Sequence, residues 1–435
     1  MNRVIPAIFG LFALTPLSAN SSNLLDVYQA AQKSDPILKQ SIYQQESTQE
    51  DLTQAYATLY PTISASASLS ENYSTNISNQ DYDYSKQNIQ LQLDQTVYDA
   101  RALIARDMAE LQVKSGEDTL EQARQSLILR VTNAYFDVLL AEDSFKLNQL
   151  ELKAISRQLE QAQQRYEVGI IAITEVLTAQ AGYDKTLANS LAAENDLKIS
   201  NEQLKEITGS SFSDLARLSE EFNLQSPIPN DINEWVNTAL ENNPGITSLK
   251  YQIDSMKKNI KLQQSSHYPS LNLNANYQYS DVDGPTASSA RAGSDSSINL
   301  KLSVPIYTGG KISSSIRQAN SDYELMASKL DELQRSIEKQ TRSYFLGVIS
   351  NIAQIKALKQ AVISAKSSLD ATEAGYMVGT QTIVDMLNIQ RDLYAAKKQL
   401  LSAQYNYVKS MIALKSSAGT LTEKDLAEVN QLFTN

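Results

Sequence analysis

A short sequence that occurs twice, 210 residues apart, limits the fold of this chain more than any other feature. The first copy, RYEVGIIAITEVL, occupies 165–177, and the second, GYMVGTQTIVDML, occupies 375–387. Both contain Tyr-x-Val-Gly followed by an isoleucine, an acid and a leucine at the same spacing. Because each copy lies inside a long helical pattern, Gly169 and Gly379 indicate turns between antiparallel helices. One chain therefore carries the same helical hairpin twice.

The duplication extends over the whole chain. Further matched pairs recur at offsets of 208 and 209, namely Tyr60-Pro61 with Tyr268-Pro269 and Tyr135-Phe136 with Tyr344-Phe345. Because the offset between matched residues changes so little along the chain, the elements of the two copies must have nearly equal lengths. We therefore expect two structural repeats, 20–225 and 226–435. Each should contain a helix, a pair of strands and a long helical hairpin that turns near 169 or 379.

Two pairs of segments alternate between apolar and polar residues, which is the pattern of β-strands. The clearest are NIQLQLDQTV at 88–97 and SINLKLSVPI at 297–306. Strands are expected at about 61–70, 87–98, 269–280 and 297–307. Their lengths suit tilted strands that cross a bilayer, with the amide-rich face toward water and the apolar face toward lipid. A half-buried sheet of a soluble protein would show the same alternation, so that alternative stays open.

The helical segments have coiled-coil spacing. Apolar residues recur at alternating steps of four and three from Leu127 to Tyr166. The second copy starts the same spacing at Ile312 and continues it through Gln340 and Tyr344. As a single helix, 99–167 would be about 100 Å long at ~1.5 Å per residue. A rod or a tube needs a helix of that length, whereas a globular domain does not.

Composition excludes several classes of function. Residues 1–19 have a basic start, an apolar core and a small pair Ser18-Ala19, as in a secretory signal. The formal charge of -11 disfavours nucleic acid as a partner. With no cysteine, the chain cannot form disulfides, thiolate metal sites or a lipid-carrying cysteine. The single histidine, His267, argues against histidine-based catalysis and metal binding, so no metal or cofactor is expected.

Four strands are too few to close a barrel, for which about eight is the practical minimum. The chain must therefore assemble with copies of itself or lie on another protein. The stretches YPTISASA, AYFDVLLAEDSF, LKLSVPIYTGG and YNYVKSMIALKSSAGTL, together with the two turns, resemble the TolC family of outer membrane efflux proteins over essentially all of 20–435. The resemblance implies a mainly α-helical fold with a β-barrel portion. Three protomers would each give four strands to one 12-stranded transmembrane barrel, coiled-coil helices would form a periplasmic tunnel, and a mixed α/β belt would surround it.

The same resemblance implies a function. The chain is expected to be a passive exit duct for multidrug efflux and type I protein secretion, located in the outer membrane and extending into the periplasm. Its expected partners are two further copies in a homotrimer, outer-membrane lipid, a periplasmic adaptor protein and an inner-membrane RND or ABC transporter. A periplasmic coiled-coil structural or adaptor protein is the alternative, although it would not explain the alternating strands. An enzyme is not expected, because TGGKIS at 308–313 lacks the spacing of a phosphate loop.

The resemblance also assigns a periplasmic gate to six residues, Thr174, Glu175, Tyr376, Gln381, Asp385 and Asn388. Asp385 matches an aspartate of the acidic ring that narrows the tunnel, and Asn388 stands where the family has a second aspartate. Tyr376 matches a tyrosine that links the two hairpins through Thr174 and Glu175. Gln381 replaces the arginine of that link. Both replacements weaken the ionic part of the expected gate.

The turns themselves are the expected docking surface for the adaptor, whose helical hairpin would meet the tip of the tunnel. The residues assigned to this tip are Val168, Gly169, Val378 and Gly379. The turn would then occur twice because the tunnel mouth is built from two hairpins per protomer.

Overall fold

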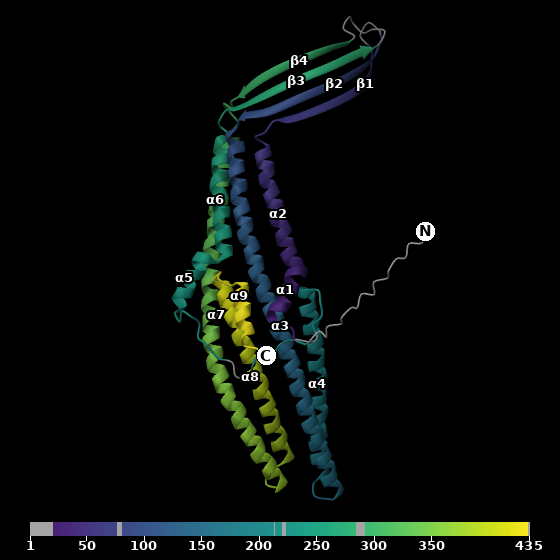
Figure 1. Ribbon diagram of the computed structural model, residues 1–435, viewed down its shortest axis with the longest axis vertical. Coiled ribbons are helices and arrows are strands. Elements are labelled where there is room, and N and C mark those ends of the chain that lie inside the picture. Colours follow the sequence, from purple (N-terminus) through teal and green to yellow (C-terminus); the bar gives the residue numbers. More distant parts are fainter. Residues whose placement is uncertain (1–20, 76–80, 213, 220–222, 284–291, 434–435) are drawn as a thin grey trace, which may run out of the picture.

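The computed structural model describes residues 21–75, 81–212, 214–219, 223–283 and 292–433 of the 435-residue chain (Figure 1). The expected secretory signal at 1–19 lies outside these residues. Among the described residues, none of the helices combines the length and the apolar character that a membrane span requires.

The elements follow one another in the same order in both halves of the chain. The first half contains α1 (Leu24–Ser34), α2 (Pro36–Ala57), β1 (Thr62–Thr75), β2 (Asp81–Tyr98), α3 (Ala100–Glu167) and α4 (Ile173–Thr208). The second contains α5 (Ile232–Asn242), α6 (Pro244–Ser265), β3 (Ser270–Asp283), β4 (Ala292–Ser303), α7 (Lys311–Met377) and α8 (Ile383–Ser417), and α9 (Glu423–Asn430) follows. Figure 1 shows a long molecule with the sheet at one end, both hairpin turns at the other, and α1, α5 and α9 about midway.

The two long helices give the molecule its length. α3 has 68 residues and α7 has 67, so each extends about 100 Å at ~1.5 Å per residue. The single helix expected over 99–167 is confirmed. The shorter helices α2 and α6 both begin with a proline behind a capping residue, Asp35 or Asn243. Proline is favoured at the first helical position because it has no N–H to leave unpaired there.

The four strands form one antiparallel sheet in the order β1-β2-β3-β4. Its register aligns the alternating residues of all four strands. One cross-strand row is Ile63, Leu93, Ala275 and Ile298, and the adjacent row is Ser64, Gln92, Asn276 and Ser297. Since successive side chains point to opposite faces, one face of the sheet is apolar and the other carries amides and hydroxyls. The outer edges of β1 and β4 have no partner strand within the described chain.

The expected fourth strand was placed too far toward the C-terminus. β4 covers Ala292–Ser303 rather than 297–307, and the backbone is irregular from Val304 onward. Pro305 explains the difference, because proline has no N–H to donate to the neighbouring strand. The alternation of Val304 and Ile306 therefore continues past the end of the sheet. Both side chains are exposed.

The largest core lies midway along the molecule. Leu127, Val131, Tyr135 and Phe136 of α3 are buried there against α1, α8 and α9. The Tyr135 hydroxyl donates to the carbonyl of Ala216 at 2.7 Å, which fixes part of the irregular segment between the repeats. The mixed α/β belt that the resemblance implies thus consists of short helices packed around the long ones, with isolated β-bridges between Ser22 and Leu215 and between Leu218 and Phe433.

The expected heptad seam of α7 is wrong at two positions. Gln340 and Tyr344 are exposed, whereas their neighbours Thr341 and Phe345 are buried. Phe345 packs in a cluster with Trp235 of α5 and residues of α8. Because α5 packs on the adjacent face of α7, that face is buried instead. The row of buried residues on α7 therefore shifts by one position after Ile337.

A buried ion pair joins the start of α2 to α3. The guanidinium of Arg130 donates to both carboxylate oxygens of Asp35, at 2.7 and 2.8 Å, and Asp35 is only 1% exposed. Burial by itself raises the pKa of Asp35, but the hydrogen bonds from Arg130 and from the Leu38 N–H outweigh it, and the pKa is lowered. The pair therefore favours the folded state when Asp35 is ionised.

Replacing Arg130 with methionine is expected to lower the free energy of unfolding by about 2–3 kcal/mol, because the Asp35 charge stays buried without its partner. The matched control is Arg124→Met, which removes an ion pair whose two side chains are largely exposed and should cost less than ~1 kcal/mol. Chemical denaturation in detergent measures both. The Asp35 carboxylate contributes fully to the free energy of unfolding at pH values above the ordinary aspartate pKa. This contribution is lost as the pH falls through the lowered pKa that Asp35 has in the folded state. Equal effects of the two substitutions would contradict the argument.

Candidate functional site at the hairpin tips

The two repeated turns have the same backbone geometry. Gly169 and Gly379 have φ of +76° and +81°. Each turn is closed by an equivalent hydrogen bond of 2.9 Å, from Ile170 N–H to the Arg165 carbonyl and from Thr380 N–H to the Gly375 carbonyl. A Cβ atom added to either repeated glycine would meet nothing within 4 Å. Glycine is therefore required by the left-handed backbone and not by crowding.

Apolar side chains project from both tips into solvent. Val168 is 69% exposed and Val378 is 76% exposed. Further exposed apolar residues on the two tips are Ile170, Ile173, Leu177, Met377 and Val384. A cluster of uncovered apolar side chains at the end of a helical hairpin indicates a protein-binding surface.

Behind the tips, the two hairpins of the chain pack on each other. Ala162 and Ala179 of the first hairpin contact Tyr376, Ile383 and Met386 of the second in one small buried cluster. Nearby, the buried amides of Gln158 on α3 and Gln390 on α8 form a hydrogen bond. Near the tips the contact between hairpins therefore contains an apolar cluster with the neutral Gln158–Gln390 hydrogen bond beside it.

Tyr376 lies in this cluster, but not with the partners that the resemblance implies. Its side chain is 5% exposed, and its hydroxyl has no hydrogen-bond partner in the structure. The expected link to Thr174 and Glu175 is therefore absent from this single protomer. Instead, the guanidinium of Arg165 lies 4.8 Å from the centre of the Tyr376 ring. A cation at that distance from an aromatic face is attracted by the electrons of the ring.

Arg165 is the residue of this site that sequence reasoning missed. The available signal was the difference between the two copies, because Arg165 in the first copy corresponds to Gly375 in the second. Gln381 also behaves differently from its expected role. Its side chain lies close to Gly375, where an added Cβ would come within 2.6 Å of the Gln381 Cγ. It therefore packs against its own turn.

Asp385 is exposed on the first turn of α8, where it closes a capping box. The Thr382 N–H and hydroxyl donate to the Asp385 carboxylate at 3.0 and 2.6 Å. In return, the Asp385 N–H donates to the Thr382 hydroxyl at 3.2 Å. The hydrogen bond from the Thr382 side chain, followed by that from its backbone, lowers the pKa of Asp385. The group is therefore a fixed negative charge at neutral pH.

Asn388 differs from Asp385 in charge, and Glu175, the equivalent acid of the first copy, differs from it in how the side chain is held. Asn388 accepts a hydrogen bond from Arg391 one turn further along α8. In the first copy, α4 begins behind Ala172, which offers no side-chain cap to Glu175. Asp385 is thus the acid at the tips that is held in a defined orientation by its own turn.

Comparisons with known proteins agree with the duplicated architecture. The model of the outer membrane efflux protein family matches this chain twice, at residues 27–210 and 235–420. The chain is 36% identical to the outer membrane protein TolC of Vibrio cholerae over 99% of this chain and 98% of that protein. It is 27% identical to the alkaline protease secretion protein AprF of Pseudomonas aeruginosa over 100% of this chain and 92% of that protein. The Campylobacter jejuni CmeC outer membrane channel has the same fold, with a TM-score of 0.79 at 16% identity, covering 94% of this chain and 90% of that one.

The fold and the tips thus define an outer-membrane channel with a long helical extension. The chain belongs to the outer membrane efflux protein family, as a TolC-type member. It is an outer-membrane exit duct for efflux and type I secretion, and its helices extend into the periplasm. The family and the relatives are channel proteins.

Proposed function

We propose that three copies of the chain form a passive duct that is opened at its periplasmic end by other proteins. The observation that carries this proposal is the closely similar geometry of two exposed apolar turns at the end opposite the sheet. Three four-stranded sheets supply twelve strands, which exceeds the number needed to close a sheet on itself. No catalytic step is assigned to the chain, and the energy for transport comes from an inner-membrane RND or ABC transporter.

The tips are the proposed docking surface for a periplasmic adaptor. Val168, Gly169, Val378 and Gly379 supply it, with backbone that glycine alone adopts without strain. An adaptor that ends in a helical hairpin buries the exposed valines and completes the helical packing of the tunnel mouth. The adaptor and its transporter select the cargo, since the duct itself offers a general polar lining rather than a specific binding pocket.

The proposed gate lies just inside the tips. Asp385 of each protomer contributes to an acidic ring, and the contact between hairpins keeps the mouth narrow. In this chain the contact is formed by the apolar cluster around Tyr376, the Arg165–Tyr376 pair and the buried Gln158–Gln390 bond. Thr174, Glu175, Gln381 and Asn388 line the same end of the tunnel and act between protomers.

The orientation of the sheet yields a direct test. Leu91 and Gln92 are neighbours in β2, but they lie on the apolar and polar faces respectively. Leu91→Arg places a charge against lipid and is expected to cost ~2–4 kcal/mol near the middle of the bilayer. Gln92→Arg, the matched control, should be tolerated because it points to water. Heat-resistant trimers on gels report assembly in the outer membrane, and equal losses in both variants would contradict this orientation.

The proposed function is tested in a host strain that lacks its own exit duct. Expression of this chain should restore both resistance to drugs and the appearance of a type I secreted protease in the medium. Resistance without secretion would limit the duct to efflux, and secretion without resistance would limit it to protein export. Neither activity, with trimers present in the outer membrane, would contradict the proposal.

A further inference from the structure

A positive charge lies beside the position where an asparagine replaces the second acid of the gate. Arg391 is one turn further along α8 than Asn388, and its guanidinium donates to the side-chain oxygen of Asn388. Long side chains on a helix point back toward the N-terminus of that helix, which for α8 is the hairpin tip. The charge of Arg391 is therefore held at the level of Asn388, one turn from Asp385.

The coiled-coil repeat brings another acid to the same face of α8. Asp392 follows Asp385 by seven residues, and both side chains are exposed. The buried residues of α8 follow heptad spacing over this stretch, namely Ile383, Met386, Gln390 and Leu393. Two residues that are seven apart therefore point to the same side. Because Asp385 lines the proposed constriction, Asp392 lines the tunnel about 10 Å further inward at ~1.5 Å per residue.

The Arg391 guanidinium is held between these two acids along the helix axis. Its anchor, Asn388, lies three residues after Asp385 and four residues before Asp392. These spacings correspond to about 5 and 6 Å at ~1.5 Å per residue, which is shorter than the ~8–10 Å over which salt screens charges. One positive charge per protomer therefore offsets one of the two negative charges.

A second carboxylate lies behind Arg391, away from Asn388. Arg391 and Glu151 of α3 both line a cavity of about 370 Å³ between the two hairpins. Burial raises the pKa of Glu151, and the nearby charge of Arg391 opposes that rise. Within the described chain, the Glu151 carboxylate forms neither a hydrogen bond nor an ion pair. The other charged side chains that line the cavity are Lys185 and Asp196 of α4 and Lys398 of α8.

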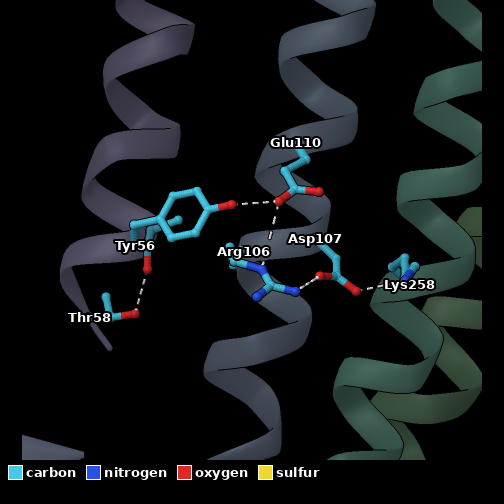
Figure 2. A network of polar contacts seen from close by, with 7 residues as sticks. Tyr56, Thr58, Arg106, Asp107, Glu110 and Lys258 are labelled. Carbon is cyan, nitrogen blue, oxygen red and sulfur yellow. Dashed lines mark hydrogen bonds and ion pairs between the residues drawn. The ribbon is translucent and has the colours of Figure 1, made fainter. Parts of the chain in front are cut away.

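The charges at the opposite end of the long helices are arranged differently. Figure 2 shows Asp107 of α3 between Arg106 and Lys258, at 2.5 Å from the guanidinium and 2.7 Å from the ammonium. A carboxylate there neutralises its basic neighbours through charge-assisted hydrogen bonds. Arg391 instead lies on a neutral amide, while Glu151 across the cavity stays unpaired. The amide fixes the position of the guanidinium but leaves its positive charge free to act on the tunnel.

We propose that Arg391 determines the charge selectivity of the gate. Held on Asn388, the three copies of Arg391 cancel the inner acidic layer of Asp392, so that Asp385 remains the layer with net charge. Asn388 is then the anchor of a positive layer and not simply a lost acid. The proposal rests on the duct and the gate proposed above, and it names the residues that decide which ions the gate admits.

Arg391→Gln removes the positive layer and leaves two acidic layers, Asp385 and Asp392. Cation preference should rise, and block by spermidine, a trivalent cation, should become roughly tenfold tighter because charges at this separation are only partly screened. Arg391→Lys keeps the charge and should stay within about twofold of the unmodified chain. Lys398→Gln, the matched control, removes a charge two turns further along α8 and should change neither quantity. Reversal potentials and current block in planar bilayers measure both.

The inner acidic layer provides a test that a purely structural role would not pass. Asp385→Asn by itself should abolish cation preference, because the layers of Arg391 and Asp392 cancel. In the Arg391→Gln background the same substitution should leave a cation preference, which Asp392 supplies. Asp392→Asn alone should lower the cation preference roughly twofold, because Arg391 is then uncompensated. Asn388→Ala should resemble Arg391→Gln, because the released guanidinium is drawn to the Glu151 carboxylate across the cavity.

Heat-resistant trimers in outer-membrane fractions report the assembly of each variant, and Asn388→Ala gives the decisive reading if Arg391→Gln does not assemble. Unchanged selectivity and block in Arg391→Gln, with Asp385→Asn still effective, would overturn the role of Arg391 and leave the gate intact. Loss of cation preference in the double variant Arg391→Gln/Asp385→Asn would overturn the cancellation by Asp392. Unchanged selectivity in Asp385→Asn alone would instead contradict the proposed gate.

Discussion

Replacing Gly379 with leucine is expected to abolish efflux while trimers still reach the outer membrane. Gly379 has a φ of +81°, and nothing lies within 4 Å of the position that a Cβ would occupy. The substitution therefore strains the turn by about 1–3 kcal/mol without a clash inside the protomer. Its side chain projects from the tip, where the adaptor has to approach. Drug susceptibility and the amount of trimer in outer-membrane fractions measure the two effects separately.

Two control variants separate backbone strain from bulk at this position. Gly379→Ala imposes the same backbone conformation with a much smaller side chain, so it should retain part of the efflux. Gly347→Ala, in the middle of α7, would meet only the Ser410 hydroxyl at an ordinary 3.7 Å and should be silent. Normal efflux in Gly379→Leu would show that the tip is not the docking surface. Loss of trimers in that variant would assign its effect to folding.

Removing the charge of Asp385 is expected to abolish the cation preference of the resting pore and its block by multivalent cations. Three copies of this carboxylate form a ring at the proposed constriction, and a ring of like charges attracts cations. Asn388 adds only neutral dipoles, so the ring has a single charged layer. Asp385→Asn is the sharper variant, because the amide oxygen can still accept the hydrogen bonds of Thr382. Reversal potentials across a salt gradient in planar bilayers measure the preference.

The pH dependence of the pore follows from the same group. Hydrogen bonds from Thr382 lower the pKa of Asp385 in the single protomer, whereas repulsion among three carboxylates in the ring acts in the opposite direction. Cation preference should therefore be complete at neutral pH and disappear as the pH falls through the pKa of the ring. Glu175→Gln, at the equivalent position of the first copy, is the matched control and should leave block by multivalent cations in place. Unchanged selectivity in Asp385→Asn would place the constriction elsewhere.

The parts of the fold that could be predicted from the sequence depend on periodic patterns. Alternation at 88–97 and 297–306 identified two of the strands and their apolar face, and the register of the sheet confirms the face assignment. Heptad spacing predicted the single long helix that became α3. These patterns predict secondary structure because a strand or a helix is formed by residues close together in the chain. The repeated offset then predicted that both halves contain the same elements.

Local patterns were less reliable where a single residue changed the outcome. Alternation continued past Ser303, but Pro305 removed the N–H that the sheet needed. Heptad spacing continued to Gln340 and Tyr344, but packing against α5 shifted the buried stripe to Thr341 and Phe345. In the first case the backbone chemistry of one residue ended the strand, and in the second the packing partner of α7 decided which residues were buried.

The sequence by itself determined the duplication, the strands, the long helices and the glycine turns of this protein, because each is encoded by neighbouring residues. Only the tertiary structure decided how the turns are held together. Gln158 and Gln390 are 232 residues apart, and no spacing rule joins two such amides. The contact of Arg165 with Tyr376 in place of Thr174 and Glu175 likewise depends on how two hairpins rotate against each other. That rotation is set by the summed packing of residues far apart in the chain, which local periodicity does not encode.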